Sequence, residues 1–386
     1  MNSAEKTVTY LDLARLFLRL SLVAFGGPVA HIAMVEDEVV ARRQWLTRAH
    51  FLDMVAATNL IPGPNSTEVM IHIGYIKKGI PGAVLAGVCF IGPAFLLTLA
   101  LAVLYVQSGA LPQINALLWG IKPVIVAIIA NVGLRFAQTA LKGRALWLLC
   151  VGCLALLLLD MSEVLVMLGA GLLYAFYTQH WPSLLAVFAL SPLLQHAAQT
   201  AERVGLWEIF FYFLRIGSVL FGSGYLLVAY IQQDLVNSFG WLSAQQVLDA
   251  VAIGQMTPGP VLTTVTVVGY IVAGFPGALV GTIGVFLPAF VLVIVTAPLL
   301  PKMRTSKFWG AFLAGVNTGV VAAIALTLID LTQAALRTPS GVTFSPLAAV
   351  MAVLSLALLL RWKINTTWLI LGSALVGLFL FFVGYS

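Results

Sequence analysis

The sequence predicts an all-α integral membrane protein with about ten transmembrane helices in two related halves, and three observations lead to this fold class. Hydrophobic residues make up 61% of the 386 residues and charged residues only 9%, whereas soluble domains carry about 25% charged residues. Many apolar runs reach the roughly 20 residues with which a helix crosses a bilayer. Finally, Phe17-Leu18-Arg19 recurs 196 residues later as Phe213-Leu214-Arg215.

The repeat continues well beyond this first motif. Its copies pair as Trp45/Trp241, Asp53/Asp249, Asn59/Gln255 and Pro62-Gly63-Pro64/Pro258-Gly259-Pro260, and after a one-residue shift as Gly74-Tyr75-Ile76/Gly269-Tyr270-Ile271, Pro81-Gly82-Ala83/Pro276-Gly277-Ala278 and Pro93-Ala94-Phe95/Pro288-Ala289-Phe290. Related halves with helix breakers between apolar runs are typical of secondary transporters. We therefore expect an N-terminal transporter repeat at residues 1–180, a linker at 181–205 and a C-terminal transporter repeat at 206–386, which move a solute with little or no covalent chemistry.

Each half is expected to contain five spans and one shorter unit. The spans lie near 11–34, 80–106, 113–137, 145–159 and 164–179, and near 206–231, 275–300, 308–331, 344–360 and 367–384. The shorter units consist of arms 47–60 and 65–76 in the first half, and 243–256 and 261–273 in the second. Each arm has about 12–14 residues, too few for a crossing. Because Pro62, Pro64, Pro258 and Pro260 break the helix between the arms, each unit is predicted to be a re-entrant helical hairpin.

The basic loops predict the orientation of these spans. They contain Arg42, Arg43, Arg48, Lys77, Lys78, Lys142, Arg144, Lys302, Arg304, Lys307, Arg361 and Lys363. If all of them are cytoplasmic, one hairpin enters from each face of the membrane and both termini lie outside. Duplication of an odd number of spans gives such an inverted-topology repeat.

The hairpin tips are the first candidate substrate site. A helix that starts after Pro-Gly-Pro has free backbone N–H groups and a partial positive charge at its N-terminus, which attracts anions. The residues concerned are Gly63, Asn65, Ser66 and Thr67 at the first tip, and Gly259, Thr263 and Thr264 at the second. The alternative interpretation is a simple kink, with the Ser and Thr hydroxyl groups capping the freed backbone.

Two arginines are the second candidate. Arg19 and Arg215 occupy matching depths in the first span of each half, where an arginine costs roughly 2.5 to 3.5 kcal/mol and normally faces a polar cavity or a partner. The planar fork of donors on a guanidinium suits a tetrahedral oxyanion. The alternatives are snorkelling to a head group, or an internal ion pair with Asp53 or Asp249.

Three further titratable residues could carry a coupling proton. Glu68 and His72 stand one turn apart on the second arm of the first hairpin, so they share a helix face. His31 lies close to the first arginine in sequence. Glu68 would repel an anion unless it is protonated, which suits a proton carrier. The alternative is that these side chains make satisfied polar contacts near the interface.

Composition argues against other functions. The net charge of +6 includes no long basic run, so no nucleic-acid partner is expected. Cys150 and Cys153 form a CxxC inside an apolar run without a nearby His or acidic ligand, and packing explains them better than a metal or redox site. We expect no metal and no cofactor.

Several motifs together resemble those of the chromate ion transporter family. They are Phe25-Gly26-Gly27-Pro28, Trp45-Leu46, Asn59-Leu60-Ile61-Pro62-Gly63-Pro64, Gly74-Tyr75, Pro81-Gly82-Ala83, Phe221-Gly222-Ser223-Gly224 and Gln255-Met256-Thr257-Pro258-Gly259-Pro260. The resemblance covers nearly the whole chain and the long, two-domain type. It implies gradient-driven efflux of chromate across a bacterial inner membrane, chromate resistance, and sulfate as a structural mimic and counter-substrate. The second half departs from the first at Ser223-Gly224 and Val261-Leu262, so the two hairpins are not expected to bind an anion equally.

The residues alone lead to an anion transporter but not to chromium, because chromate and sulfate share their charge and tetrahedral oxygens. Sulfate or another oxyanion is therefore the first alternative substrate. A membrane-embedded enzyme acting on lipid head groups and a structural subunit are alternatives of another class. The sequence leaves open the coupling ion, the direction of transport and the oligomeric state, a homo-oligomer included. The lipid bilayer is the one partner that the composition requires.

Overall fold

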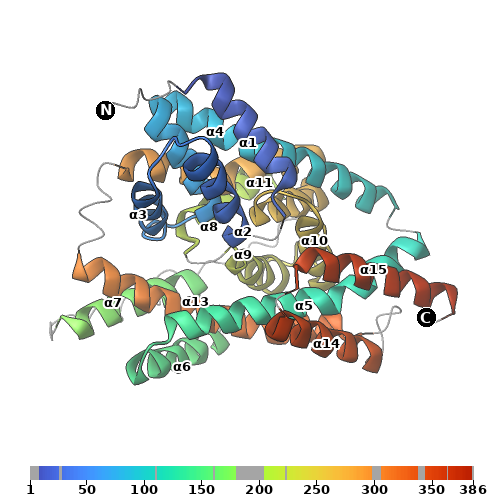
Figure 1. The fold of residues 1–386 in the computed structure, drawn as a ribbon. Helices are drawn as coiled ribbons and strands as arrows, with labels where there is room; N and C mark the ends of the chain where they lie inside the picture. Colours follow the sequence, from blue (N-terminus) through green and yellow to red (C-terminus); the bar gives the residue numbers. More distant parts are fainter. Residues whose placement is uncertain are drawn as a thin grey trace, which may run out of the picture. The chain divides into compact units, whose positions relative to one another are not determined.

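A computed structural model describes residues 8–25, 28–108, 111–159, 161–179, 204–221, 224–297, 306–337, 344–362 and 364–384. The predicted linker lies outside these residues except for 204 and 205, and so do Lys302, Arg304 and Lys363 of the predicted basic loops. Helices dominate the fold (Figure 1), and the described part of the chain contains no strand beyond an isolated bridge between Arg337 and Phe344.

The helices follow the two halves of the sequence. The first half forms α1 (Tyr10–Val23), α2 (Pro28–Glu36), the π-helix η1 (Asp37–Arg42), α3 (Arg48–Thr58), α4 (Asn65–Ser108), α5 (Pro112–Ala140), α6 (Arg144–Leu158) and α7 (Glu163–Thr178). The second half forms α8 (Leu206–Val219), α9 (Leu226–Tyr230), the π-helix η3 (Ile231–Ser238), α10 (Ala244–Met256), the 3-10 turn η4 (Val261–Thr263), α11 (Thr264–Thr296), α13 (Lys307–Ala335), α14 (Pro346–Trp362) and α15 (Thr366–Phe382).

The first span of each half is interrupted, which differs from the continuous helices expected at 11–34 and 206–231. α1 ends at Val23 and α2 starts at Pro28, because a proline has no N–H to continue a helix but fits its first position. α8 ends at Val219, and Leu220 leaves the helical conformation with ψ 90°. Each half therefore places an irregular segment inside its first apolar run.

α4 and α11 each contain a sharp internal turn. The turn in α4 lies at Lys78 and Gly79, with φ 63° at the glycine, and the turn in α11 lies at the equivalent Ala273 and Gly274, also with φ 63° at the glycine. A positive φ favours glycine. These turns separate the predicted arms 65–76 and 261–273 from the spans that follow.

The limbs on either side of each turn pack closely. A Cβ atom at Gly74 would overlap the carbonyl group of Gly82, and one at Gly269 would overlap that of Gly277. Small residues allow such close backbone contact between helices in membranes. The two halves therefore repeat this local geometry as well as the motif.

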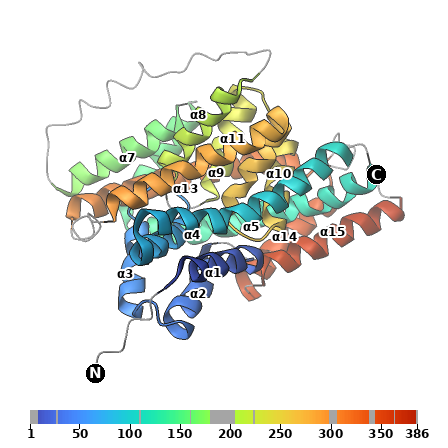
Figure 2. The same ribbon diagram turned by 90° about the horizontal axis from the view of Figure 1, so that it is seen from above.

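The chain folds into two compact units, and each takes segments from both halves. Unit 1 consists of Met1–Val103, Val204–Gly224 and Ile253–Arg304, and unit 2 of Leu104–Arg203, Tyr225–Ala252 and Thr305–Ser386. Within unit 1, α11 packs against α8. Within unit 2, α13 packs against α5, α6 and α7, and α5 also contacts α14 and α15; α7 and α13 run side by side in both views (Figures 1 and 2). These units do not coincide with the predicted repeats at residues 1–180 and 206–386, because each unit combines segments of both. The division of the chain into two transporter repeats stays a prediction.

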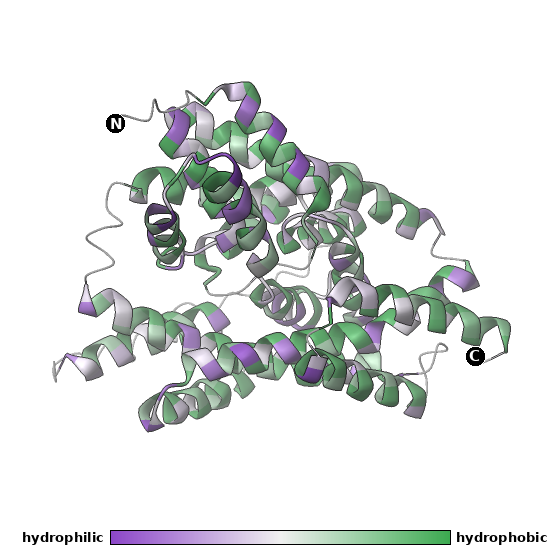
Figure 3. Ribbon diagram, viewed as in Figure 1, coloured by the Kyte–Doolittle hydropathy of each residue, from purple (hydrophilic) through white to green (hydrophobic). Residues whose placement is uncertain are grey.

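The helices have the length and surface of membrane spans. Asn65–Ser108, Pro112–Ala140, Val261–Thr296 and Lys307–Ala335 are long and apolar enough to cross a bilayer, and α6, α7, α14 and α15 are shorter apolar helices. Hydrophobic residues cover most of the helices (Figure 3), and large apolar side chains such as Trp147, Leu148, Trp368 and Phe382 are exposed. Exposed apolar surface of this extent needs lipid around it. The predicted all-α, multi-pass membrane protein is confirmed.

Candidate functional site

Both Pro-Gly-Pro triplets separate two helices at a glycine with positive φ. The angle is 141° at Gly63, between α3 and α4, and 103° at Gly259, between α10 and η4. Because an L side chain rarely adopts this conformation, glycine is required at each position. We call residues 62–64 the first break and residues 258–260 the second break.

The two breaks are connected by reciprocal backbone hydrogen bonds within unit 1. The N–H of Gly63 donates to the carbonyl oxygen of Leu220 at 2.7 Å, and the N–H of Gly259 donates to that of Ala24 at 3.0 Å. Ala24 and Leu220 are equivalent in the sequence repeat and follow α1 and α8 directly. Each break is thus bound to the interrupted first span of the other half. Four helix interruptions meet here, and discontinuous helices form the substrate sites of many secondary transporters.

The first turn of α4 presents its N-terminus to the first break. The carbonyl oxygen of Pro64 accepts from the N–H groups of Thr67 (2.8 Å) and Glu68 (3.1 Å). The earlier N–H groups, those of Asn65 and Ser66, therefore have no carbonyl partner within the helix. Such donors, together with the helix dipole, favour negative charge at this end.

A small network of polar side chains closes the first break. The hydroxyl group of Thr58 donates to the Oδ1 of Asn65 at 3.0 Å, and the side-chain amide of Asn65 donates to the Oδ1 of Asn59. The side chain of Asn65 therefore ties the end of α3 to the start of α4. Because the side chain is engaged in this network, the predicted contribution of Asn65 to anion binding has to come from its backbone N–H group.

His31 lies between the first break and the end of α1. Its Nε2 is 3.0 Å from the carbonyl oxygen of Ala24, and its Nδ1 is 3.4 Å from the Oγ of Ser66. The ring is buried and packs edge-on against Phe90, with 5.8 Å between ring centroids. Because a carbonyl oxygen only accepts, Nε2 must carry the proton of this hydrogen bond.

Glu68 is the most unusual side chain at the first break. It is completely buried, and neither carboxyl oxygen has a hydrogen-bond partner within the described part of the chain. Its Oε1 occupies the space that a Cβ atom on Gly63 would need. The hydroxyl group of Thr67 and the Nδ1 of His72 are also buried without a partner. Unpartnered buried polar atoms are rare and costly, and they call for an explanation such as a bound water, ion or proton.

The second break lacks comparable donors. Val261–Thr263 forms a single 3-10 turn before α11. The hydroxyl group of Thr263 donates to the carbonyl oxygen of Pro260 and that of Thr264 to Val261, both at 2.9 Å. These hydroxyl protons are used by the backbone, as the capping alternative expects. The unequal anion binding expected from the Val261-Leu262 departure stays a prediction.

The two arginines lie in different surroundings. Arg19 is an exposed side chain on α1, 61% accessible, and its Nη1 is 3.4 Å from the Oε1 of Glu38. Glu38 also binds Arg42 and Arg43. The guanidinium carbon of Arg215 lies 5.5 Å from the centroid of the Tyr212 ring. Sequence reasoning considered Asp53 as the partner of an arginine and missed Glu38, although four charges at 37, 38, 42 and 43 were a visible signal.

A buried charge cluster in unit 2 was also missed as a set. The Nζ of Lys122 lies 3.1 Å from the Oδ1 of Asp249, and the hydroxyl group of Tyr105 donates to the Oδ2 at 3.0 Å. The two charged side chains are only 13% and 8% exposed. Asp249 thus forms an ion pair with a lysine, whereas its repeat counterpart Asp53 is exposed. Nothing in the sequence marks a pairing of residues so far apart in the chain.

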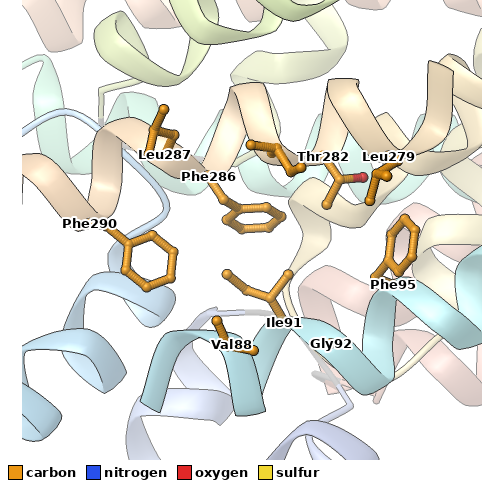
Figure 4. Close-up of a pocket in the computed structure, with 10 residues that line it drawn as sticks. Val88, Ile91, Gly92, Phe95, Leu279, Thr282, Phe286, Leu287 and Phe290 are labelled. Atoms are coloured by element: carbon orange, nitrogen blue, oxygen red, sulfur yellow. The ribbon is translucent and has the colours of Figure 1, made fainter. Parts of the chain in front are cut away.

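Other features of the described residues offer no anion site. No group of three or more His, Cys, Asp or Glu side chains there could hold a metal ion. A cavity of about 300 Å³ lies between α4 and α11 (Figure 4), lined by Val88, Ile91, Gly92, Phe95, Leu279, Thr282, Ile283, Phe286, Leu287 and Phe290. The hydroxyl group of Thr282 already donates to the carbonyl oxygen of Ala278 at 2.7 Å. The lining is otherwise apolar, so the cavity gives an anion nothing to bind.

Known proteins match nearly the whole chain. The profile of the family described as Chromate transporter matches residues 11–176 and 207–378, two stretches that start one repeat offset apart. A Chromate transport protein of Cupriavidus metallidurans is 32% identical over 381 residues, which cover 96% of this chain and 93% of the relative. One of Pseudomonas aeruginosa is 34% identical over 394 residues, covering 97% and 93%.

A shorter relative matches 40% of the chain. The Uncharacterized transporter YwrA of Bacillus subtilis is 27% identical over 154 residues, which cover 40% of this chain and 85% of the relative. No solved structure matches the chain. The double match to the family profile and the full-length relatives establish that the chain belongs to the chromate transporter family, as a long, two-domain member.

Proposed function

We propose that this protein exports chromate across a bacterial inner membrane by alternating access and thereby confers chromate resistance. The relatives that match along nearly their whole length are named chromate transport proteins, which favours transport over an enzymatic role. The observation that carries the proposal is the pair of reciprocal hydrogen bonds, Gly63 to Leu220 and Gly259 to Ala24. They bring the helix breaks of both halves into one compact unit, where a single substrate can be held.

The first break is the stronger anion cradle in this proposal. The backbone N–H groups of Asn65 and Ser66 and the hydroxyl groups of Ser66 and Thr67 surround it. The second break contributes the N-terminal N–H groups before Thr263 and Thr264. Gly63 and Gly259 shape the backbone at the two breaks, because their own N–H groups already donate to Leu220 and Ala24. A dianion gains from helix N-termini and hydroxyl donors in a site that excludes water. Arg19 and Arg215 add positive charge on α1 and α8.

We place the coupling proton on one of three buried titratable side chains beside the first break: Glu68, His72 and His31. A dianion that leaves the cell moves with the membrane potential, which supplies the driving force for its export. Each of these three side chains can bind and release a proton, and no cofactor is needed for this.

The two halves are proposed to be inverted repeats, each with a re-entrant hairpin at its break. Supporting observations are the matched turns at Gly79 and Gly274, the double family match and the half-length relative. Single cysteines at Lys78 and Ala273, in an otherwise cysteine-free protein, should react with impermeant reagents from opposite faces of the membrane. Labelling of both from the same face would refute the inverted arrangement.

Uptake into everted membrane vesicles tests the transport proposal. Vesicles that contain the protein should accumulate labelled chromate in a saturable manner, faster with a proton gradient than after its collapse. Labelled sulfate is the parallel arm, because the N–H and hydroxyl donors described above recognise oxygens that both anions share. Accumulation of sulfate without chromate would replace the substrate, and accumulation of neither above that of vesicles lacking the protein would overturn the proposal.

A further inference from the structure

His31 physically joins the two breaks. The carbonyl oxygen of Ala24 accepts hydrogen bonds from the Nε2 of His31 at 3.0 Å and from the N–H of Gly259 at 3.0 Å. On its other side, the Nδ1 of His31 lies 3.4 Å from the Oγ of Ser66, in the first turn of α4. One imidazole ring therefore connects the second break to the anion-binding end of the first.

The proton on Nε2 determines what Ser66 can do. A neutral imidazole carries one proton, so Nδ1 has none and accepts the hydrogen bond from the Ser66 hydroxyl. A hydroxyl group has only one proton to give. With His31 neutral, Ser66 therefore cannot donate to an anion, although it is buried at the N-terminus of α4.

We propose that His31 links anion binding at the first break to the uptake of one proton. When a proton from solution binds at Nδ1, the ring donates to the Oγ of Ser66 and the hydroxyl group turns to donate to the bound oxyanion. The positive charge of the ring adds to the attraction. When the proton leaves, Ser66 again donates to His31 and the anion is held less strongly. The proposal rests on the proposed function, in that it assumes an oxyanion at the first break.

Other charged or titratable side chains lie on α2 and on the elements that contact α2 or His31. They include Glu36 on α2, Asp12, Arg15 and Arg19 on α1, Asp37, Glu38 and Arg42 on η1, Arg48 and His50 on α3, and Glu68, His72, Lys77 and Lys78 on α4. None of them makes a described hydrogen bond or ion pair with His31. Arg19 and Glu38 instead pair with each other. Glu68 and His72 are the groups against which the proposal has to be tested.

The second half lacks both partners of this hydrogen bond. The repeat counterpart of His31 is Leu227, and that of Ser66 is Leu262; both are buried apolar side chains. Only the first break therefore has this connection. In this proposal anion binding is linked to a proton at the first break and not at the second, so the two halves have different roles in the transport cycle.

Anion binding by the purified full-length chain in lipid nanodiscs tests the proposal. Calorimetry would give the Kd for sulfate and for chromate at pH 6, 7 and 8. Sulfate is the cleaner probe, because it does not take up a proton in this range; chromate results are compared between variants at the same pH. One linked proton makes the Kd rise with pH by up to about tenfold per unit. The wild type should show this slope, and His31→Gln should show a flat profile.

Matched variants separate His31 from its neighbours. His72 is a second buried histidine and lies on α4, and His72→Gln should keep the wild-type dependence of the Kd on pH. Glu68→Gln should keep it as well, whereas the double variant Glu68→Gln/His31→Gln should lose it. The proposal is overturned if His31→Gln keeps the slope of the wild type, or if Glu68→Gln alone abolishes it. Absence of binding of either anion by the wild type at every pH would instead overturn the proposed function.

Ser66→Ala provides a second, independent test that leaves the histidine in place. At pH 6 it should weaken anion binding, because the Ser66 hydroxyl group that donates to the anion is removed. At pH 8 it should leave the Kd unchanged, because the hydroxyl group is already committed to His31. Equal weakening at both values of pH, or no change at either, would contradict the proposed hydrogen-bond reversal even if His31→Gln failed to fold.

Discussion

The backbone N–H of Gly63 donates to the carbonyl oxygen of Leu220 across 2.7 Å, which ties the first helix break to the interrupted end of α8. The equivalent bond from Gly259 to Ala24 ties the second break to the end of α1. Each half thus stabilises the irregular backbone of the other. The two halves are thus joined at the breaks by backbone hydrogen bonds, without any side chain between them.

The glycines at the breaks should tolerate no side chain. In Gly63→Ala the new Cβ would overlap the Glu68 carboxyl group, and in Gly259→Ala it would overlap Ala94. Backbone strain adds about 1–3 kcal/mol. We expect lower thermal unfolding midpoints and loss of chromate uptake in both variants. Gly79→Ala has a similar strain but open space around its Cβ, so it should lose less stability. An equal loss in all three variants would show that close packing at the breaks does not matter.

Glu68 should tolerate a neutral isostere but not truncation. Its two oxygens accept no described hydrogen bond, so Glu68→Gln removes no partner and avoids a buried ionised group. We expect its free energy of unfolding to stay within about 1 kcal/mol of the wild type, with uptake retained. Glu68→Ala leaves a cavity and should cost about 2 kcal/mol or more. Thermal unfolding in detergent and vesicle uptake measure both. A severe loss of stability in Glu68→Gln would mean that the carboxylate has an essential partner.

The ion pair between Lys122 and Asp249 should behave as a buried pair. Removing one charge leaves the other buried and uncompensated, which costs about 3–5 kcal/mol. Asp249→Asn and Lys122→Met should each lower the unfolding midpoint strongly, whereas the double variant should recover at least half of the loss. Arg135→Gln is the control on the same helix, because its Nε donates at 3.2 Å to the neutral Asn131. Losses that simply add in the double variant would argue against coupling of the two charges.

Arg19 and Arg215 should matter for transport more than for stability. Arg19 is 61% exposed in its pair with the buried Glu38, and loss of Arg19 leaves Glu38 bound to Arg42 and Arg43, so the loss of stability should be small, about 0–1 kcal/mol. We expect Arg19→Gln and Arg215→Gln to reach the membrane in normal amounts but to lose chromate uptake at least tenfold. Arg42→Gln removes another exposed partner of Glu38 and should keep uptake. If Arg19→Gln and Arg42→Gln transport equally well, Arg19 has no role in anion binding.

Much of the helix arrangement could be predicted because its causes are local. The expected spans 113–137, 145–159 and 308–331 correspond to α5, α6 and α13 within a few residues, since length and hydrophobicity set the limits of a membrane helix. The breaks were predictable because proline and glycine act on their own backbone. The interruption of α1 and α8 was missed, because the apolar residues on either side read as one continuous span.

The candidate site also has features that could be predicted from the sequence and features that could not. The sequence by itself determined the membrane class, the repeat, the two breaks and the polar residues after them, because composition, periodicity and proline chemistry are local properties. Only the tertiary structure decided that Gly63 binds Leu220, that His31 reaches Ser66, that Arg19 pairs with Glu38 and Lys122 with Asp249. Each of these contacts depends on which helices pack together, and a single sequence contains no local signal for a partner far along the chain.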